Sequence, residues 1–218
     1  MLDFSPELEA YLSVHIDEED PVLAELNRET HLKILHPRML SGHLQGKILT
    51  LFSKILQPET ILEVGTFTGY SAICLARGLK PGGKLHTIDI NDELVDFSSA
   101  FFKKAGLEKS IILHTGNALQ IIPEMDETFD LVFLDGEKAE YSQYYDHVFD
   151  KVNTGGLIIA DNVLWDGKVL KAPQPNDRST KGIIEFNDRI AKDNRVEKVI
   201  FPVRDGFTVI RKKNRNDP

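Results

Sequence analysis

From residue 60 onward, short apolar runs alternate with segments that have helical spacing. The runs cover residues 60–64, 84–88, 110–114, 129–134 and 156–160. The helix-like segments between them cover residues 70–79, 92–105, 118–122 and 141–152. Strands that alternate with helices indicate βαβ units, in which the strands are parallel and helices cover both faces of the sheet. The pattern therefore predicts an α/β fold built on a mostly parallel sheet.

Both ends of the chain depart from this alternation. Helices are expected at the N-terminal end over residues 6–14, 21–35 and 46–56. At the other end, a loop over 162–179 and a helix over 180–193 precede two β-rich runs, 196–203 and 207–211. Arg204, Asp205 and Gly206 separate these two runs, and Asp-Gly between strands is a hairpin signal. The sheet is therefore expected to close with an antiparallel pair.

Composition limits the class of protein. The chain has 218 residues, 41% of them hydrophobic and 28% charged, which fits one globular domain over residues 1–218. A net charge of −8 disfavours broad binding to nucleic acid or to an anionic membrane. No apolar run approaches the roughly 20 residues of a membrane span, and the first residues do not resemble a secretory signal. With Cys74 as its single cysteine, the chain is expected in a reducing, cytoplasmic setting.

Two polar clusters follow two of the predicted strands. Asp135-Gly136-Glu137-Lys138 comes after the run 129–134, and the segment 161–167, Asp-Asn-Val-Leu-Trp-Asp-Gly, comes after the run 156–160. Open α/β sheets bind their ligands at the carboxyl ends of the strands. Asp135, Asp161 and Asn162 offer hard oxygen donors, which suit Mg²⁺ or Ca²⁺ better than zinc. The clusters therefore predict a divalent cation site that would chelate two adjacent substrate hydroxyls.

Lys138 lies three residues after the first of these acids. It could accept a substrate proton, provided that burial and the nearby cation lower its pKa. An ordinary structural role remains possible for each residue alone, since an Asp after a strand often caps a helix and a Lys is usually solvated. Trp165 could equally belong to the core or to the rim of the site. The two clusters together favour the functional interpretation.

A glycine-containing loop, residues 63–71 (Glu-Val-Gly-Thr-Phe-Thr-Gly-Tyr-Ser), joins the first strand to its helix. Gly65 and Gly69 permit a tight turn, but Phe67 occupies the position where a dinucleotide fold needs its second glycine. A ligand with adenosine and no phosphate fits better, and S-adenosylmethionine is the common one. Asp89, a little over 20 residues beyond the loop, could hold the ribose hydroxyls. The alternative is that the glycines only form a turn and Asp89 only caps a helix.

The third predicted strand adds a further element. It is followed by Gly116-Asn117-Ala118, which could line the adenine. The loop, the acid and this strand end together favour a cofactor site.

At these residues the chain resembles the cation-dependent O-methyltransferases, the family of caffeoyl-CoA and catechol O-methyltransferases. The resemblance runs from about Met39 to the end of the chain. It is carried by the segments 39–42, 63–71, 87–91, 104–106, 133–135, 161–167 and 203–208. It implies a Rossmann-like class I methyltransferase fold with a seven-stranded, mostly parallel sheet, a C-terminal antiparallel hairpin and helices on both faces, and it implies a homodimer.

The same resemblance assigns roles to individual residues. The cofactor S-adenosylmethionine would be contacted by Met39, Ser41, Glu63, Gly65, Thr66, Gly69, Tyr70, Ser71, Asp89, Ile90, Asn117, Ala118 and Asp135. The metal, Mg²⁺ or another divalent cation such as Mn²⁺ or Ca²⁺, would be held by Asp135, Asp161 and Asn162. Lys138 would be the catalytic base, assisted by Asp135, and Lys138, Trp165 and Asp166 would face the substrate.

Two positions depart from the plant pattern of this family. The plant motif Asp-Ala-Asp-Lys is Asp-Gly-Glu-Lys here, which leaves the role of Glu137 open. Asp166 stands where the plant enzymes have Asn, which puts contacts to an acyl-CoA in doubt. The N-terminal helical segment, residues 1–38, and the loop at 168–179 match less clearly, and these parts shape the substrate pocket in this family.

The sequence supports three functional hypotheses of different kinds. The leading one is a Mg²⁺-dependent O-methyltransferase that acts on a small vicinal diphenol. The second is a methyltransferase for hydroxylated uridine in tRNA, against which the negative net charge counts. The third is a non-catalytic module that binds an adenosine ligand, although such a module has no need of a metal and a base. A dehydrogenase is a distant alternative because of Phe67.

Overall fold

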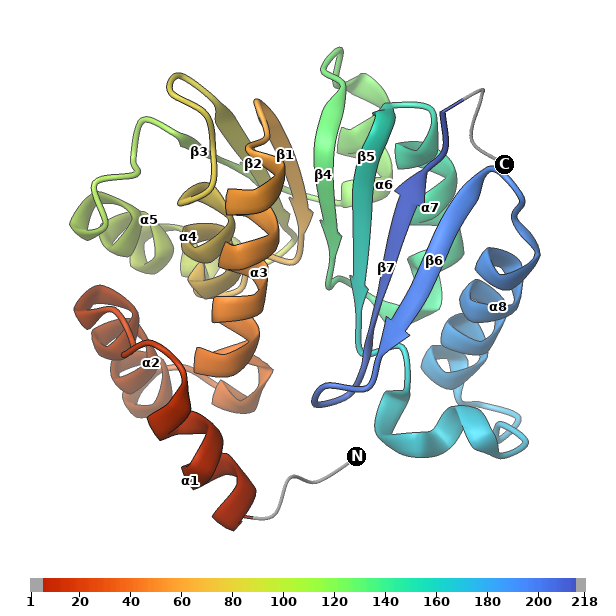
Figure 1. Ribbon diagram of the computed structural model, residues 1–218, viewed down its shortest axis with the longest axis horizontal. Helices are drawn as coiled ribbons and strands as arrows, with labels where there is room; N and C mark the ends of the chain where they lie inside the picture. The colour runs from red at the N-terminus through yellow and green to blue at the C-terminus, as the bar shows by residue number, and fades with distance from the viewer. Residues whose placement is uncertain (1–5, 215–218) are drawn as a thin grey trace. The chain divides into compact units, whose positions relative to one another are not determined.

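The structure, a computed structural model, describes residues 6–214 and contains one sheet of seven strands. Figure 1 shows its helices and strands. The strand order is β3-β2-β1-β4-β5-β7-β6. β2 pairs with β3 and β4 with β5 in parallel, whereas β7 pairs antiparallel with both β5 and β6. The predicted fold, a Rossmann-like and mostly parallel sheet with a C-terminal antiparallel hairpin, is confirmed.

The described residues form two compact units, here called the N-terminal unit (residues 6–61 and 65–116) and the C-terminal unit (62–64 and 117–214). Strand β1 (Thr60–Val64) contributes to both. Residues 1–5 and 215–218 of the predicted single domain lie outside the described part of the chain. The single-domain organisation stays a prediction.

The N-terminal unit carries the helices at the start of the chain and the strands β2 and β3. Its elements are α1 (Pro6–His15), α2 (Pro21–Lys33), the 3₁₀ helix η1 (Pro37–Met39), α3 (Gly42–Leu56), α4 (Tyr70–Ala76), β2 (Lys84–Asp89), η2 (Asp92–Leu94), α5 (Val95–Lys104) and β3 (Ile111–Thr115). Local sequence explains the start of α2, where the Asp20 side chain accepts hydrogen bonds from the amides of Val22 and Leu23. Helix α2 packs against α4 and α5.

The C-terminal unit carries the other four strands. Its elements are α6 (Ala118–Glu124), β4 (Phe129–Leu134), η3 (Lys138–Glu140), α7 (Tyr141–Phe149), β5 (Val152–Asp161), η4 (Trp165–Leu170), α8 (Arg178–Lys192), β6 (Val196–Phe201) and β7 (Phe207–Lys212). Helices α6, α7 and α8 pack in sequence, each against the next. Five of the six residues of β4 are buried, which explains its continuous apolar sequence.

Most differences from the predicted elements concern their ends. Strand β5 begins at Val152, four residues earlier than expected, and α7 therefore ends at Phe149 rather than at 152. The expected loop 162–179 contains the 3₁₀ helix η4. Among residues 6–214, no helix is both long and apolar enough to cross a membrane.

Candidate functional site

In the N-terminal unit, the glycine loop between β1 and α4 is held by its own backbone. The Gly65 amide donates to the carbonyl of Ile88 on β2 (2.9 Å), and the Gly69 amide donates to the carbonyl of Thr66 (2.8 Å). Thr66 and Thr87 share a buried hydroxyl–hydroxyl hydrogen bond of 2.5 Å. These contacts fix the loop against the end of β2 before any ligand binds.

Asp89, at the end of β2, closes the same loop from the other side. One carboxylate oxygen accepts from the Phe67 amide (2.7 Å) and the other from the Asn91 amide (2.9 Å). Phe67 has a φ of 47°, in the left-handed region that non-glycine residues rarely occupy. Asp89 therefore stabilises a strained loop, and each oxygen has a second lone pair with which it can accept a ribose hydroxyl.

The other predicted cofactor residues of this unit differ in environment. Ser41 precedes α3 and is buried, and Ser71 is buried in the first turn of α4, whereas Met39 and Ile90 are exposed. The Tyr70 hydroxyl donates to a Glu19 carboxylate oxygen (2.6 Å), so it is engaged by the segment that precedes α2. Burial is the largest of the causes that raise the Tyr70 pKa, which keeps this phenol neutral.

In the C-terminal unit, Lys138 and Asp135 form an ion pair. Lys138 Nζ lies 2.7 Å from Asp135 Oδ1 and donates a second bond to the Gly136 carbonyl (3.1 Å). The lysine side chain is 11% exposed and the aspartate 19%. Burial acts to lower the Lys138 pKa, but the charges of Asp135 and Asp161 outweigh it and raise the pKa above its ordinary value. This direction is opposite to the lowering of the pKa that Lys138 would need to act as a base.

Asp161 ends β5 and Asn162 follows it. Asp161 is 5% exposed, and its Oδ1 accepts from the Asn162 amide (2.8 Å). Asn162 has a φ of 56°, so its backbone is strained. Both Asp135 and Asp161 therefore stand at carboxyl ends of the neighbouring parallel strands β4 and β5, as the sequence predicts.

The segment after Asn162 is also strained. Trp165, Asp166 and Gly167 all have φ values between 45° and 69°. The β6–β7 turn supports them, because the Asp205 carboxylate accepts from the Asp166 amide (2.5 Å) and the Asp205 carbonyl accepts from the Leu164 amide (2.9 Å). The indole N–H of Trp165 is buried without a hydrogen-bond partner in the described structure. The predicted substrate residues Trp165 and Asp166 thus occupy a constrained segment.

Besides Asp135, three predicted cofactor residues belong to the C-terminal unit. Glu63 is fully buried in β1, and Ala118 is 7% exposed at the first position of α6. Asn117 caps this helix, because its side chain accepts from the Leu119 amide (2.8 Å). Asn117 therefore has a structural role whether or not it touches a ligand.

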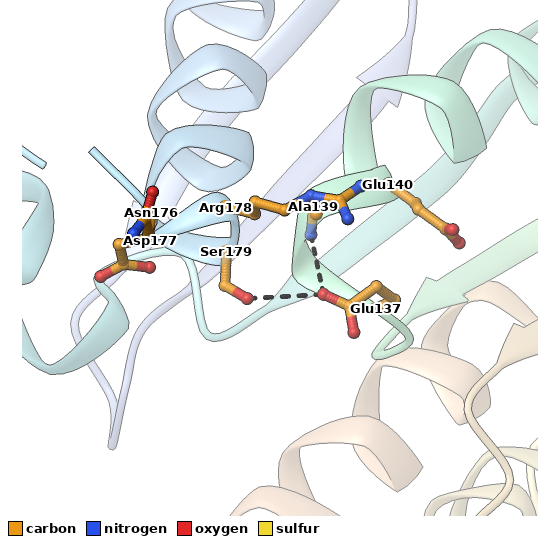
Figure 2. A pocket seen from close by; sticks show the side chains of 7 residues that line it. All are labelled: Glu137, Ala139, Glu140, Asn176, Asp177, Arg178 and Ser179. Atoms are coloured by element: carbon orange, nitrogen blue, oxygen red, sulfur yellow. Dashed lines mark hydrogen bonds between the residues drawn. The ribbon is translucent and has the colours of Figure 1, made fainter. Parts of the chain in front are cut away.

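Glu137, the residue that the sequence left open, lines a pocket in this unit. Figure 2 shows its Oε1 accepting from the Ala139 amide of η3 (3.2 Å) and from the Ser179 hydroxyl in the first turn of α8 (3.4 Å). The other residues around this cavity of about 420 Å³ are Glu140, Asn176, Asp177 and Arg178. Glu137 thus caps η3 and links the turn after β4 to α8.

A divalent cation fits the charge and the donor chemistry of the strand ends. Within residues 6–214, no group of three or more His, Cys, Asp or Glu side chains is arranged to hold a metal, but the predicted set needs only two carboxylates and one amide. The Lys138 ammonium already binds Asp135, so this carboxylate accepts a positive partner. Oxygen donors of this kind suit Mg²⁺.

Comparison with known proteins gives a consistent result. A family model described as O-methyltransferase matches residues 12–213. The chain is 33% identical over 211 residues to caffeoyl-CoA O-methyltransferase 1 of Nicotiana tabacum. The alignment covers 92% of this chain and 87% of the relative. A homologous caffeoyl-CoA O-methyltransferase of Pinus taeda is 34% identical over 213 residues and covers 92% and 81%.

Solved structures agree. The O-methyltransferase TomG of Streptomyces achromogenes, involved in tomaymycin synthesis and determined with SAM, superposes with a TM-score of 0.89 at 29% identity, over 95% of this chain and 96% of TomG. An O-methyltransferase of Bacillus cereus in complex with SAH gives 0.86 at 30% identity, over 95% and 97%.

Proposed function

The chain belongs to the O-methyltransferase family, and we propose that it uses a divalent cation, best matched by Mg²⁺, to methylate one hydroxyl of a small vicinal diphenol. Family membership makes it an S-adenosylmethionine-dependent enzyme, so the binding-module and dehydrogenase hypotheses are set aside. The homodimer and the cytoplasmic location stay predictions.

The pairing of a buried lysine with an aspartate at the end of β4 carries this proposal. The pair is 2.7 Å apart, and Asp161 at the end of β5 is close enough to raise the Lys138 pKa. A purely structural ion pair in this position would need neither the second carboxylate nor the strained Asn162 beside it. Strain of this kind concentrates at functional sites.

The residues of the chain would divide the work as follows. Asp135, Asp161 and Asn162 would hold the cation, and Lys138 Nζ would take the proton from the substrate hydroxyl. When bound, the cation would lower the pKa of that hydroxyl, and S-adenosylmethionine would supply the methyl group. The glycine loop with Asp89, and Ser41, Ser71 and the other predicted cofactor residues, would position the cofactor. Trp165 and Asp166 would orient the diphenol.

Lys138 can act as a base in this mechanism only when its ammonium has lost a proton. The raised pKa keeps Lys138 protonated beside Asp135 and Asp161, and a protonated lysine cannot accept a proton. A cation held by the same carboxylates would offset the charge that raises this pKa. The proposal therefore needs the cation for the base as well as for the substrate.

The first test measures methyl transfer from labelled S-adenosylmethionine to a panel of diphenols, before and after thorough chelation with EDTA. Activity that is lost on chelation and restored by Mg²⁺ is expected. Full activity after chelation would rule out the metal-dependent mechanism. Undermodified tRNA belongs in the same panel, and label in RNA with none in any diphenol would replace the diphenol by a nucleic-acid substrate.

The second test addresses the base. Lys138→Met should reduce turnover about 10²–10⁴-fold, the usual contribution of a general base. The matched control is Lys80→Met, which removes an exposed lysine paired with Glu59 (3.1 Å) and should leave turnover unchanged. Unimpaired turnover in Lys138→Met would remove Lys138 from the mechanism.

A further inference from the structure

Tyr141, the first residue of α7, contacts the ends of the two strands that carry the proposed cation ligands. Its side chain is fully buried, and its hydroxyl lies 3.1 Å from the carbonyl of Leu134 and 3.1 Å from the carbonyl of Asp161. Leu134 immediately precedes Asp135, and Asp161 is itself a proposed ligand. One phenol thus bridges the carboxyl ends of β4 and β5.

The ring of Tyr141 contacts both Lys138 and Phe186. The Lys138 ammonium lies 5.2 Å from the ring centroid, within the range of a cation–π interaction. Phe186 of α8 packs edge-on against the same ring, with ring centroids 5.5 Å apart and ring planes at 85°. Both the ring and the hydroxyl are therefore fixed by contacts, which leaves the hydroxyl little freedom to release either carbonyl.

The hydroxyl is what distinguishes Tyr141 from a phenylalanine, which would fill the same space and keep the ring contact to Phe186. A buried phenol without a partner is costly, and this hydroxyl interacts with the two strand-end carbonyls and with the Lys138 ammonium. The hydroxyl carries a single proton, which the two carbonyls share, so both strand ends are held at one distance from one atom.

We propose that Tyr141 is a positioning residue for the cation, whose hydroxyl sets the separation between the strand ends that present Asp135 and Asp161. This inference rests on the proposed function, because it assigns Tyr141 a role toward a cation held by those aspartates. Groups that orient metal ligands without touching the metal commonly change metal affinity 10–100-fold when they are removed.

The same helix provides a matched control. Tyr145 is also fully buried, its ring also packs edge-on against Phe186 (6.2 Å, 78°), and its hydroxyl donates a single hydrogen bond. That bond goes to Asp193 (3.0 Å), beyond α8 and not at either strand end. Tyr145→Phe therefore reproduces the loss of a buried phenol hydrogen bond without touching the proposed cation site.

The experiment measures Mn²⁺ binding to the full-length protein by calorimetry and by electron paramagnetic resonance, for wild type, Tyr141→Phe and Tyr145→Phe. Tyr141→Phe should bind Mn²⁺ 10–100-fold more weakly, and Tyr145→Phe should bind it like the wild type. Urea unfolding of both variants in chelator should give similar losses of stability. In turnover assays, Tyr141→Phe should need more cation, with turnover recovering as the cation reaches saturation.

The outcomes distinguish a failure of the proposed function from a failure of the positioning role of Tyr141. Wild-type protein that binds no divalent cation would overturn the proposed function and this inference with it. Wild-type binding with unchanged affinity in Tyr141→Phe would overturn the positioning role alone. Equal weakening in both variants would do the same, because it would show that any buried phenol lost from α7 affects the site through stability.

Discussion

Gly206, in the turn between β6 and β7, should be among the least replaceable residues near the proposed substrate segment. Its φ is 75°, and a Cβ at this position would lie 2.4 Å from Leu164 Cγ and 2.7 Å from Leu164 Cδ1. Cγ lies close to the backbone, so rotating the end of the leucine side chain does not relieve the clash. Gly206→Ala must therefore move either Leu164 or the turn.

Two contributions set the expected magnitude. An L-residue in the left-handed region costs about 1 kcal/mol relative to glycine, and forcing an extra methyl into a packed site costs about 1–3 kcal/mol. Together they predict a loss of about 2–4 kcal/mol in the free energy of unfolding. The Gly206 carbonyl also accepts from the Val163 amide (3.0 Å), so the displacement should reach Asn162 and weaken cation binding.

Gly155→Ala is the matched control for the backbone contribution. Gly155 has a similar φ of 83°, but no atom lies within 4 Å of an added Cβ. Urea denaturation should give a loss of about 1 kcal/mol for this variant, and the difference between the two variants isolates the clash. Leu164→Ala in the Gly206→Ala background should recover part of that difference. Equal losses in Gly206→Ala and Gly155→Ala would refute the assignment of a clash.

Three further outcomes are expected. The Arg195 hydrogen bond lowers the Asp193 pKa to about 2, so Asp193→Asn should reduce the free energy of unfolding by about 1 kcal/mol near pH 7. The loss is modest because Arg195 is 58% exposed. Urea titrations should show the loss disappearing as the pH falls from about 4 to 2, where Asp193 becomes protonated. In Gly69→Ala the new Cβ would meet the Phe102 ring at 2.4 Å, so calorimetry should show at least 10-fold weaker S-adenosylmethionine binding, whereas an unchanged affinity would place the cofactor away from this turn. Glu137→Ala should reduce the free energy of unfolding by about 0.5–1 kcal/mol, because it removes the cap of η3. The KM for unsubstituted catechol should stay unchanged. A large rise in that KM would instead make Glu137 a substrate contact.

The sequence predicts the buried strands better than their surroundings. Strands β1 and β4 match their expected bounds because their residues are apolar and buried almost throughout, so the sequence pattern and the strand coincide. The sequence predicts β5 too short because its first residue, Val152, is followed by Asn153, Thr154 and Gly155, which lack the apolar signal. Its first residues are defined by pairing with β4, where the register shifts, and this depends on contacts that local sequence does not show.

In the candidate site too, some features could be predicted from the sequence and others could not. The place of Asp135, Asp161 and Asn162 at strand ends could be predicted because polar residues after apolar runs mark the carboxyl ends of parallel strands. The Asp-Gly of the β6–β7 turn was recognised as a hairpin signal, but its support of Asp166 and Leu164 was not, because that contact spans about forty residues. Tyr141 carried no motif, and its role follows only from the packing of α7 against the ends of β4 and β5.

The ion pair between Lys138 and Asp135 gives the site a state that the sequence did not suggest. The ammonium and a divalent cation would compete for the Asp135 carboxylate, so each would weaken the binding of the other. Lys138 also donates to the Gly136 carbonyl and faces the Tyr141 ring, so it would keep these two partners if a cation were bound. Without a cation, the lysine neutralises the carboxylate and limits the repulsion that two uncompensated aspartates would create. In the proposed mechanism the same side chain would thus both balance the charge of Asp135 and act on the substrate.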